Sequence, residues 1–259
     1  MDLGVAERVA VVIGGASGIG SATVKLLANE GAEVSSWDLV PTPTSVTASS
    51  RLVDVTQLSQ IESAWSETEK SLGSIDMLVH TAAVGSGHFG FPYTRVPIDA
   101  WSRVLQVNII GMANVAQVAG PAMQSRRSGS MVFLSSVAGQ MGSQTDPPYS
   151  ATKAANINFV QCMAKDLGPY GVRVNCVCPG MVKTPLNESV WKAWRDTQPE
   201  ASRLSYDDWA ESKIKQVIPL GRWQKADDIA AMIVFLLSPR ASEVTGQTIN
   251  VDGGCVMHS

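Results

Sequence analysis

The chain has 259 residues, of which 45% are hydrophobic and 17% are charged, and its formal net charge is −3. This composition is typical of a folded domain with a large core and excludes a disordered chain. The longest basic run is Arg126–Arg127, so we expect neither a nucleic-acid partner nor a basic membrane-surface helix.

The first apolar segment of the chain is the short run Val9–Ile13. It is too short for the core of a signal peptide or for a membrane span. The cysteines form no CxxC pair, so we expect reduced thiols, a cytoplasmic location and no metal site. They are Cys162, Cys176, Cys178 and Cys255.

Strand-like and helix-like segments alternate along the whole chain. The expected strands are Val9–Ile13, Glu33–Trp37, Arg51–Val53, Met77–His80, Ser130–Leu134, Arg173–Val177 and Thr248–Val251. The expected helices are Gly20–Glu30, Ile61–Leu72, Trp101–Gln124, Tyr149–Leu167 and Asp227–Leu237. This alternation, with continuous apolar strands, predicts a doubly wound parallel α/β sheet covered by helices on both faces. We expect a single domain over residues 1–259.

Three glycines follow the first strand, at Gly14, Gly18 and Gly20. They form either an ordinary tight turn or a turn that lets a phosphate group approach the start of the next helix. Asp38 favours the second interpretation, because it ends the next strand 20 residues after Gly18. A dinucleotide fold places there the acid that holds the adenosine ribose hydroxyls. Its carboxylate would repel a 2′-phosphate, and Ser17 offers no compensating charge, so NAD is favoured over NADP.

Short motifs in a fixed order extend over nearly the whole chain. They are GGASGIG (14–20), LVDVT (52–56), LVHTAA (78–83), VNIIG (107–111), FLSSVAG (133–139), YSATK (149–153), RVNCVCPGMVKT (173–184) and VTGQTINVDGG (244–254). With these motifs the chain resembles the short-chain dehydrogenase/reductase family. The resemblance implies one Rossmann-type domain, commonly assembled as a homotetramer, but it does not name a substrate.

The chain departs from the family pattern at two places. Ile13 stands where the family usually has Thr, and His80-Thr81-Ala82-Ala83 stands where it has an Asn-Asn-Ala-Gly-like stretch. In the family, that Thr hydroxyl helps to tie the glycine loop to the Asn-Ala-Gly stretch. Since both ends of this polar contact have changed together, we expect apolar packing in its place. We interpret His80 as a structural substitution at a strand end.

Tyr149 and Lys153 lie four residues apart, on one face of a predicted helix. Hydride transfer between an alcohol and a nicotinamide needs a group that takes or gives the hydroxyl proton. Free Tyr has a pKa near 10, which leaves a gap of roughly 4 kcal/mol at neutral pH. A lysine cation about 4 Å away would supply on the order of 4 kcal/mol. The resemblance assigns Tyr149 as general acid/base, with Lys153 lowering its pKa and holding the nicotinamide ribose.

The resemblance assigns two further catalytic residues. Ser136 would orient the substrate oxygen, and Asn108 matches the family asparagine that holds a water in a proton relay to Lys153. Other residues are expected at the cofactor. They are Gly14, Ser17, Gly18, Ile19, Gly20, Asp38, Leu39, Asp54, Val55, Ala82, Ala83, Tyr149, Lys153, Pro179, Gly180, Val182 and Thr184.

A long segment at about 181–217 is expected to close over the substrate as a lid. Its tryptophans Trp191, Trp194 and Trp209 either line a bulky apolar pocket or anchor the lid to the body or to a neighbouring subunit. The expected substrate contacts are Ser136, Met141, Gln144, Tyr149, Met181 and Trp191.

The leading hypothesis is an NAD-dependent dehydrogenase of secondary alcohols that are cyclic, aromatic or otherwise apolar. A reductase of ketones or of 3-oxoacyl thioesters is the second, and a catalytically inactive nucleotide-sensing protein on the same fold is the third. Apart from a small-molecule substrate, no membrane or nucleic-acid partner is expected.

Overall fold

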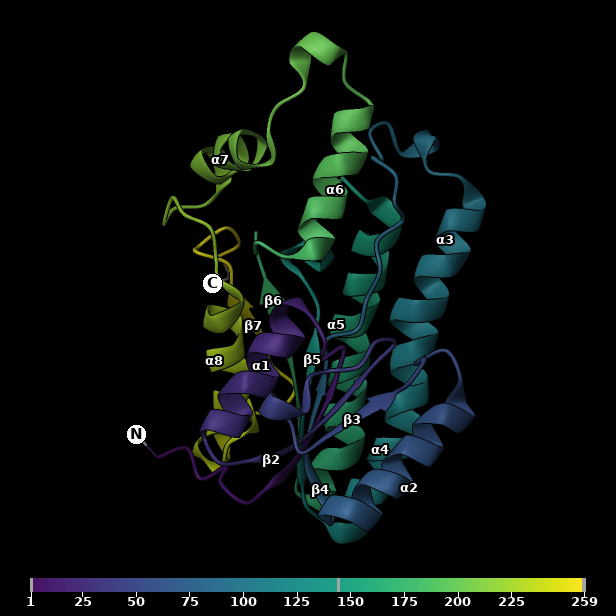
Figure 1. Ribbon diagram of the computed structural model, residues 1–259, viewed down its shortest axis with the longest axis vertical. Coiled ribbons are helices and arrows are strands. Elements are labelled where there is room, and N and C mark those ends of the chain that lie inside the picture. The colour runs from purple at the N-terminus through teal and green to yellow at the C-terminus, as the bar shows by residue number, and fades with distance from the viewer. Residues whose placement is uncertain (1, 144, 258–259) are drawn as a thin grey trace.

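The computed structural model describes residues 2–143 and 145–257 and is built around one seven-stranded sheet (Figure 1). Every pair of neighbouring strands is parallel, in the order β3-β2-β1-β4-β5-β6-β7. The strands are β1 Val9–Ile13, β2 Glu33–Asp38, β3 Ser49–Leu52, β4 Ile75–His80, β5 Gly129–Leu134, β6 Val172–Pro179 and β7 Thr248–Val251. The predicted doubly wound parallel sheet is confirmed.

Helices cover both faces of this sheet. Helices α1 and α8 pack on one face, where they contribute Val24 and Ile233 to the core, and α2, α4 and α5 pack on the other. The helices are α1 Gly18–Asn29, α2 Leu58–Leu72, α3 Ile98–Leu105, α4 Gly111–Arg126, α5 Pro147–Leu167, α6 Pro185–Asp196, α7 Tyr206–Val217 and α8 Ala226–Leu237.

Strand β1 shows why the strands read as continuous apolar runs. Val9, Val11 and Ile13 belong to the core under α2, α4 and α5, whereas Ala10 and Val12 belong to the core under α1 and α8. Successive side chains of a strand point to opposite faces, so a sheet covered on both faces requires apolar residues at every position.

The helix predicted over Trp101–Gln124 is composite in the structure. Helix α3 runs into a π-helical segment, Gln106–Ile110, which continues as α4. Such a segment inserts an extra residue into a helical turn and occurs often at functional sites. Here it contains the buried Asn108. Helices α6 and α7, at the upper end of the molecule in Figure 1, occupy the segment expected to form a lid.

The strand order places one crevice at the carboxyl ends of β1 and β4. The chain runs from β1 outward to β2 and β3, then crosses back to β4 on the other side of β1. Ligands of doubly wound sheets bind at this point, where the strand order reverses. The loops that follow β1 and β4 therefore face the same crevice.

Arg173 on β6 fixes the opposite, carboxyl end of α8. Its guanidinium Nη1 donates to the carbonyl oxygens of Leu236 (2.7 Å) and Val244 (3.3 Å), and Nη2 donates to those of Leu237 (3.2 Å) and Ser238 (3.1 Å). The last carbonyls of a helix have no partner within the helix. Arg173 satisfies them here, together with Ser130 Oγ, which also donates to the Leu236 carbonyl (3.2 Å), and Arg173 holds the loop that leads to β7.

Replacing Arg173 with Met should lower the melting temperature by about 5–10 °C, because hydrogen bonds to a charged group contribute roughly 1.5–3 kcal/mol and a domain of this size loses about 2–4 °C per kcal/mol. Thermal unfolding followed by circular dichroism measures the change. Arg222→Met removes the same side chain from an exposed position and should leave the melting temperature nearly unchanged. Equal melting temperatures of the two variants would contradict this role of Arg173.

Candidate active site

Three of the four predicted catalytic residues line one small cavity at the carboxyl edge of the sheet. Ser136 lies two residues after the end of β5, and its Oγ accepts a hydrogen bond from the Ala138 amide (3.1 Å) at the start of a short 3₁₀ turn. Tyr149 and Lys153 lie on the first turns of α5. The cavity, called the catalytic cavity below, has a volume of about 150 Å³. It is lined by Ile19, Thr81, Ala83, Gly85, Leu134, Ser135, Ser136, Asp146, Tyr149, Lys153, Pro179, Gly180, Val182, Thr184, Leu186, Asn187 and Val190.

Lys153 is buried, with 2% of its surface exposed, and its ammonium group makes two contacts. Nζ donates to the carbonyl oxygen of Leu134 (2.8 Å) and lies 5.4 Å from the centre of the Tyr149 ring. Burial lowers the pKa of Lys153 to about 8. The side chain is therefore mostly cationic at neutral pH and begins to lose its proton just above it.

The pKa of Tyr149 is raised above its ordinary value in this structure, and a lowering of that pKa by Lys153 stays a prediction. Burial is the largest cause, because a phenolate loses solvation there. The hydrogen bond with Ser136 acts in the opposite direction, and the negative charge of Asp146 adds to the increase. Tyr149 thus carries its proton at neutral pH and is suited to donate it.

Asn108 contacts the loop after β4 rather than Lys153. Its Oδ1 accepts from the Val84 amide (2.9 Å), and its Nδ2 donates to the Val84 carbonyl and to Thr152 Oγ1 (3.0 Å each). These bonds tie the π-helical segment to α5 and to the loop that borders the catalytic cavity. A water relay from Asn108 to Lys153 stays a prediction.

A second cavity of about 450 Å³ adjoins the catalytic cavity and follows the glycine turn. The two cavities share Ile19, Thr81, Ala83, Leu134, Thr184 and Leu186. Every residue that we expected at the cofactor lines one cavity or the other. The sequence reasoning did not include further residues of the second cavity, among them Thr56, Arg103 and Val107.

The glycine turn fits a bound pyrophosphate. Gly14 has φ +83°, and a Cβ there would lie 2.6 Å from Thr81 Oγ1, while a Cβ on Gly20 would overlap the carbonyl of Gly14. The turn is therefore both tight and closely packed. Ser17, the residue before α1, makes no side-chain cap, so its hydroxyl leaves the first amides of the helix open to an anion.

Asp38 completes the fit of this cavity to a dinucleotide. The residue ends β2 and lines the cavity, with its Oδ2 accepting from the Ala16 amide (3.0 Å) and its Oδ1 from the Leu39 amide (2.7 Å). These bonds hold the carboxylate beside the glycine turn, where its free lone pairs suit the hydroxyls of a ribose.

The predicted loss of a polar contact between the strand ends is wrong. Thr81 Oγ1 donates to the carbonyl oxygens of Ile13 (2.8 Å) and Gly14 (3.2 Å), so a hydroxyl from the neighbouring strand keeps the glycine turn in place. Ile13 packs into the core instead. His80 stacks on Phe133, with ring centres 5.8 Å apart, and burial lowers its pKa to about 3.

The structure separates the predicted substrate residues from one another. Ser136 and Tyr149 line the catalytic cavity, whereas Met141, Met181 and Trp191 do not. Gln144 lies outside the described residues. Eight residues of this cavity were missed as site residues: Thr81, Gly85, Leu134, Ser135, Asp146, Leu186, Asn187 and Val190. For Asp146, the sequence offers only the preference of Asp for the position before a helix, which it occupies at α5.

The tryptophans of the expected lid pack on one another. Trp209 is buried, and the ring centres of Trp194 and Tyr206 lie 6.1 and 6.2 Å from its own. We call the group the aromatic lid cluster; it comprises Trp209, Ala210, Ile214, Ile218, Met181, Val190, Trp191, Trp194, Tyr206, Trp223 and Cys255. Of the two expected roles, anchoring the lid agrees with this packing. Val190 belongs to both the cluster and the catalytic cavity.

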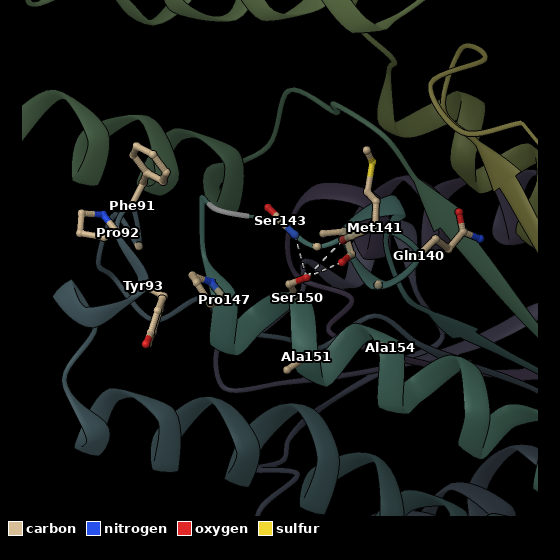
Figure 2. Close-up of a pocket in the computed structure, with 14 residues that line it drawn as sticks. Phe91, Pro92, Tyr93, Gln140, Met141, Ser143, Pro147, Ser150, Ala151 and Ala154 are labelled. Atoms are coloured by element: carbon tan, nitrogen blue, oxygen red, sulfur yellow. Dashed lines mark hydrogen bonds between the residues drawn. The ribbon is translucent and has the colours of Figure 1, made fainter.

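Met141 borders a larger open groove beside α5 (Figure 2). The groove measures about 540 Å³ and runs between the loop at Phe91–Tyr93 and the loop at Gln140–Ser143. The Ser150 hydroxyl fixes the second loop by donating to the Ala138 carbonyl (2.5 Å) and accepting from the Ser143 amide (3.1 Å). Ser136, Tyr149 and Lys153 do not line this groove, so we assign the chemistry to the smaller cavity.

The described residues show neither a membrane span nor a metal centre. Within 2–143 and 145–257, no helix is long and apolar enough to cross a bilayer. The same ranges contain no group of three or more His, Cys, Asp or Glu side chains placed to hold a metal ion.

Comparisons with known proteins agree with this geometry. A family model described as enoyl-(acyl carrier protein) reductase matches residues 14–256. The 3-oxoacyl-[acyl-carrier-protein] reductase of Thermotoga maritima is 34% identical over 96% of this chain and 98% of its own length. The cis-4-hydroxycyclohexanecarboxylate dehydrogenase of Sinomonas cyclohexanicum is 33% identical over 96% of each chain. A crystal structure of levodione reductase is similar with a TM-score of 0.86 and 29% identity, covering 96% of this chain and 97% of that one.

Replacing Tyr149 with Phe should lower turnover by about 100- to 10,000-fold, because the ring remains while the proton donor is lost. Binding of NADH, followed by isothermal titration calorimetry, should be nearly unchanged. Tyr93→Phe, at a residue that is 73% exposed, should keep full turnover and serves as the matched control. Retention of most of the activity in the Tyr149 variant would contradict its catalytic role.

Proposed function

Because the chain belongs to the short-chain dehydrogenase/reductase family, we propose that it is an NAD-dependent dehydrogenase of compact secondary alcohols, which it converts reversibly to ketones. Enzymes of this family are oxidoreductases that use a nicotinamide dinucleotide, NAD or NADP. One observation carries the proposal: Ser136, Tyr149 and Lys153 line a cavity that adjoins the cavity of the glycine turn and shares six lining residues with it.

Ser136 and Tyr149 of the catalytic cavity have different roles in proton transfer. When an alcohol is oxidised, the Ser136 hydroxyl holds the substrate oxygen and Tyr149 Oη accepts the hydroxyl proton. When a ketone is reduced, Tyr149 Oη returns the proton to the same oxygen. The bound nicotinamide supplies the hydride acceptor in oxidation and the hydride donor in reduction. Its positive charge in the oxidised form favours the Tyr149 phenolate, as does the nearby Lys153 cation.

The preference for NAD rests on Asp38. A carboxylate that lines the second cavity at the end of β2 accepts hydrogen bonds from ribose hydroxyls, whereas a 2′-phosphate there would place two anions side by side. Arg103 adds a positive charge to the same cavity, but it lies on α3 rather than beside Asp38 on β2.

The substrate is proposed to be compact because the catalytic cavity is small. A cavity of about 150 Å³ holds a molecule of the size of benzene. Its walls include the apolar side chains of Val182, Leu186 and Val190, so a short branched or monocyclic alcohol fits best. The aromatic residues on which a bulky aromatic substrate was expected lie in the aromatic lid cluster.

A reductase of 3-oxoacyl thioesters is the second candidate, supported by the name of the Thermotoga maritima relative. Asp38 argues against the use of NADPH, which is common among such reductases. A catalytically inactive nucleotide sensor is a third candidate, and any turnover would exclude it. We also propose a homotetramer, in which the exposed apolar side chains Ile98, Leu105 and Ile110 would be covered by another subunit.

The proposal is tested by incubating the purified protein with NAD or NADP and a panel of secondary alcohols, including butan-2-ol and cyclohexanol. NADH formation with NAD, and little with NADP, is the expected result. Production of NADPH alone would exclude the NAD preference, and no reduced cofactor from any alcohol would exclude the dehydrogenase.

Replacing Asp38 with Ala should lower the ratio of kcat/KM for NAD over NADP by about 10- to 100-fold, since hydrogen bonds from ribose hydroxyls to a charged group contribute roughly 1.5–3 kcal/mol. Asp99→Ala, which changes a carboxylate in the first turn of α3, is the control and should keep the ratio. An unchanged ratio in the Asp38 variant would mean that another residue recognises the ribose.

The two directions of the reaction should respond differently to pH. Alcohol oxidation needs unprotonated Tyr149, whose fraction increases about tenfold per pH unit below its pKa. Because that pKa is raised, kcat/KM for oxidation should increase from pH 6 and flatten above about pH 8, where Lys153 loses its proton. Ketone reduction uses protonated Tyr149 and should stay constant over this range. An oxidation rate that falls as pH rises would contradict the assignment.

A further inference from the structure

We propose that Asp146 selects substrates that carry a second hydroxyl group, one or two carbons from the reacting carbinol. The compact alcohol would then be a diol or a hydroxy ketone rather than a simple alcohol or a 3-oxoacyl thioester. This inference rests on the proposed function, because it names the substrate class of the same cavity.

Asp146 occupies the wall of the catalytic cavity with spare hydrogen-bonding capacity. It precedes α5 and is 6% exposed. Its Oδ1 accepts from the Tyr149 amide (3.3 Å), and its Oδ2 accepts from the Ser86 amide (2.8 Å). A carboxylate oxygen can accept two hydrogen bonds, so each oxygen can accept one more from a donor inside the cavity.

The loop after β4 holds this carboxylate in a fixed place. A Cβ on Gly85 would lie 2.9 Å from Asp146 Oδ2, so the glycine allows the backbone to approach closely enough for the Ser86 amide to bind. Since two separate segments, 85–86 and the start of α5, fix the group, its position relative to Tyr149 is set before any substrate arrives.

The negative charge of Asp146 exceeds what a helix cap requires. Thr184 caps α6 and Ser205 caps α7 with neutral hydroxyls, and Ser, Thr and Asn serve this role about as well as Asp. No ion pair within 2–143 and 145–257 involves Asp146. A buried carboxylate without a cation is unfavourable unless hydrogen bonds compensate it. The amides of Tyr149 and Ser86 do so in part, and a donor from the substrate would stabilise it further.

The negative charge of Asp146 also discriminates between substrates by the type of functional group next to the reacting carbinol. Because the cavity measures about 150 Å³, a compact substrate that reaches both Tyr149 and Asp146 places its second group within one or two carbons of the reacting one. A hydroxyl there donates to the carboxylate. An ester or thioester carbonyl, or an ether oxygen, has only lone pairs to present to it and is disfavoured.

The experiment compares three alcohols with the same carbon skeleton: butane-2,3-diol, butan-2-ol and 3-methoxybutan-2-ol. Values of kcat/KM with NAD are measured for the full-length protein and for Asp146→Asn and Asp146→Ser, both of which keep a capping side chain. Asp166→Asn makes the same change at an exposed position of α5 and is the matched control. Circular dichroism establishes that each variant is folded.

The unmodified protein and Asp166→Asn should prefer the diol over butan-2-ol by about 10- to 100-fold, the range for one hydrogen bond to a charged group, and should use the methoxy compound least. In both Asp146 variants the diol preference should fall by at least about tenfold. A preference that survives in these variants, or that is missing from the unmodified protein, would overturn the inference.

A binding measurement separates this inference from the proposed reaction. Isothermal titration calorimetry gives the dissociation constants of the three alcohols from the complex of the protein with NADH, without any turnover. If no alcohol is oxidised but the diol binds more tightly in a manner that depends on Asp146, the proposed reaction is wrong and the inference holds. If all three alcohols are oxidised and bound alike, the reaction holds and the inference is overturned.

Discussion

The close contact between α5 and the end of β5 is the interaction on which the rest of the site depends. Ser135 Oγ donates to the Lys153 carbonyl (2.6 Å), and Lys153 Nζ donates back to the Leu134 carbonyl (2.8 Å). Gly139 allows this approach, since a Cβ there would lie 2.5 Å from the Lys153 carbonyl carbon. Because Ser136 follows the end of the strand and Tyr149 lies on the helix, this reciprocal contact fixes the relative position of the two hydroxyl groups that we propose meet the substrate oxygen.

Burial sets the electrostatic state of the catalytic cavity. It raises the pKa of Tyr149 and lowers that of Lys153, so that it disfavours the charged form of both side chains. Asp146 adds a negative charge at the same place, which opposes a phenolate further. A cavity with this balance responds strongly to an arriving positive charge. An oxidised nicotinamide would carry such a charge and a reduced one would not, so under the proposed function the state of the cofactor would shift Tyr149 between base and acid.

The fold and the shared cavity of Ser136, Tyr149 and Lys153 were predictable from the sequence, the fold from local pattern and the cavity from the resemblance to a family. Continuous apolar runs predicted the strands, and the four-residue spacing of Tyr149 and Lys153 predicted a shared helix face. The features that were missed depend on contacts between distant residues. Thr81 binds the turn at Gly14 across 67 positions, and Asp146 binds Ser86 across 60. Asp146 is of a residue type that commonly caps a helix, but no local rule could indicate that it would also bind a loop 60 residues away and form part of a cavity wall.

The aromatic lid cluster also affects the intrinsic tryptophan fluorescence of this protein. The chain has seven tryptophans, and four of them lie in this cluster: Trp191, Trp194, Trp209 and Trp223. Indole emission depends on the polarity around the ring, so the intrinsic fluorescence of the chain includes a contribution from the lid that changes with the packing of this cluster. These tryptophans thus serve as intrinsic fluorescent probes of the lid, and a change in lid packing can be followed without an attached dye.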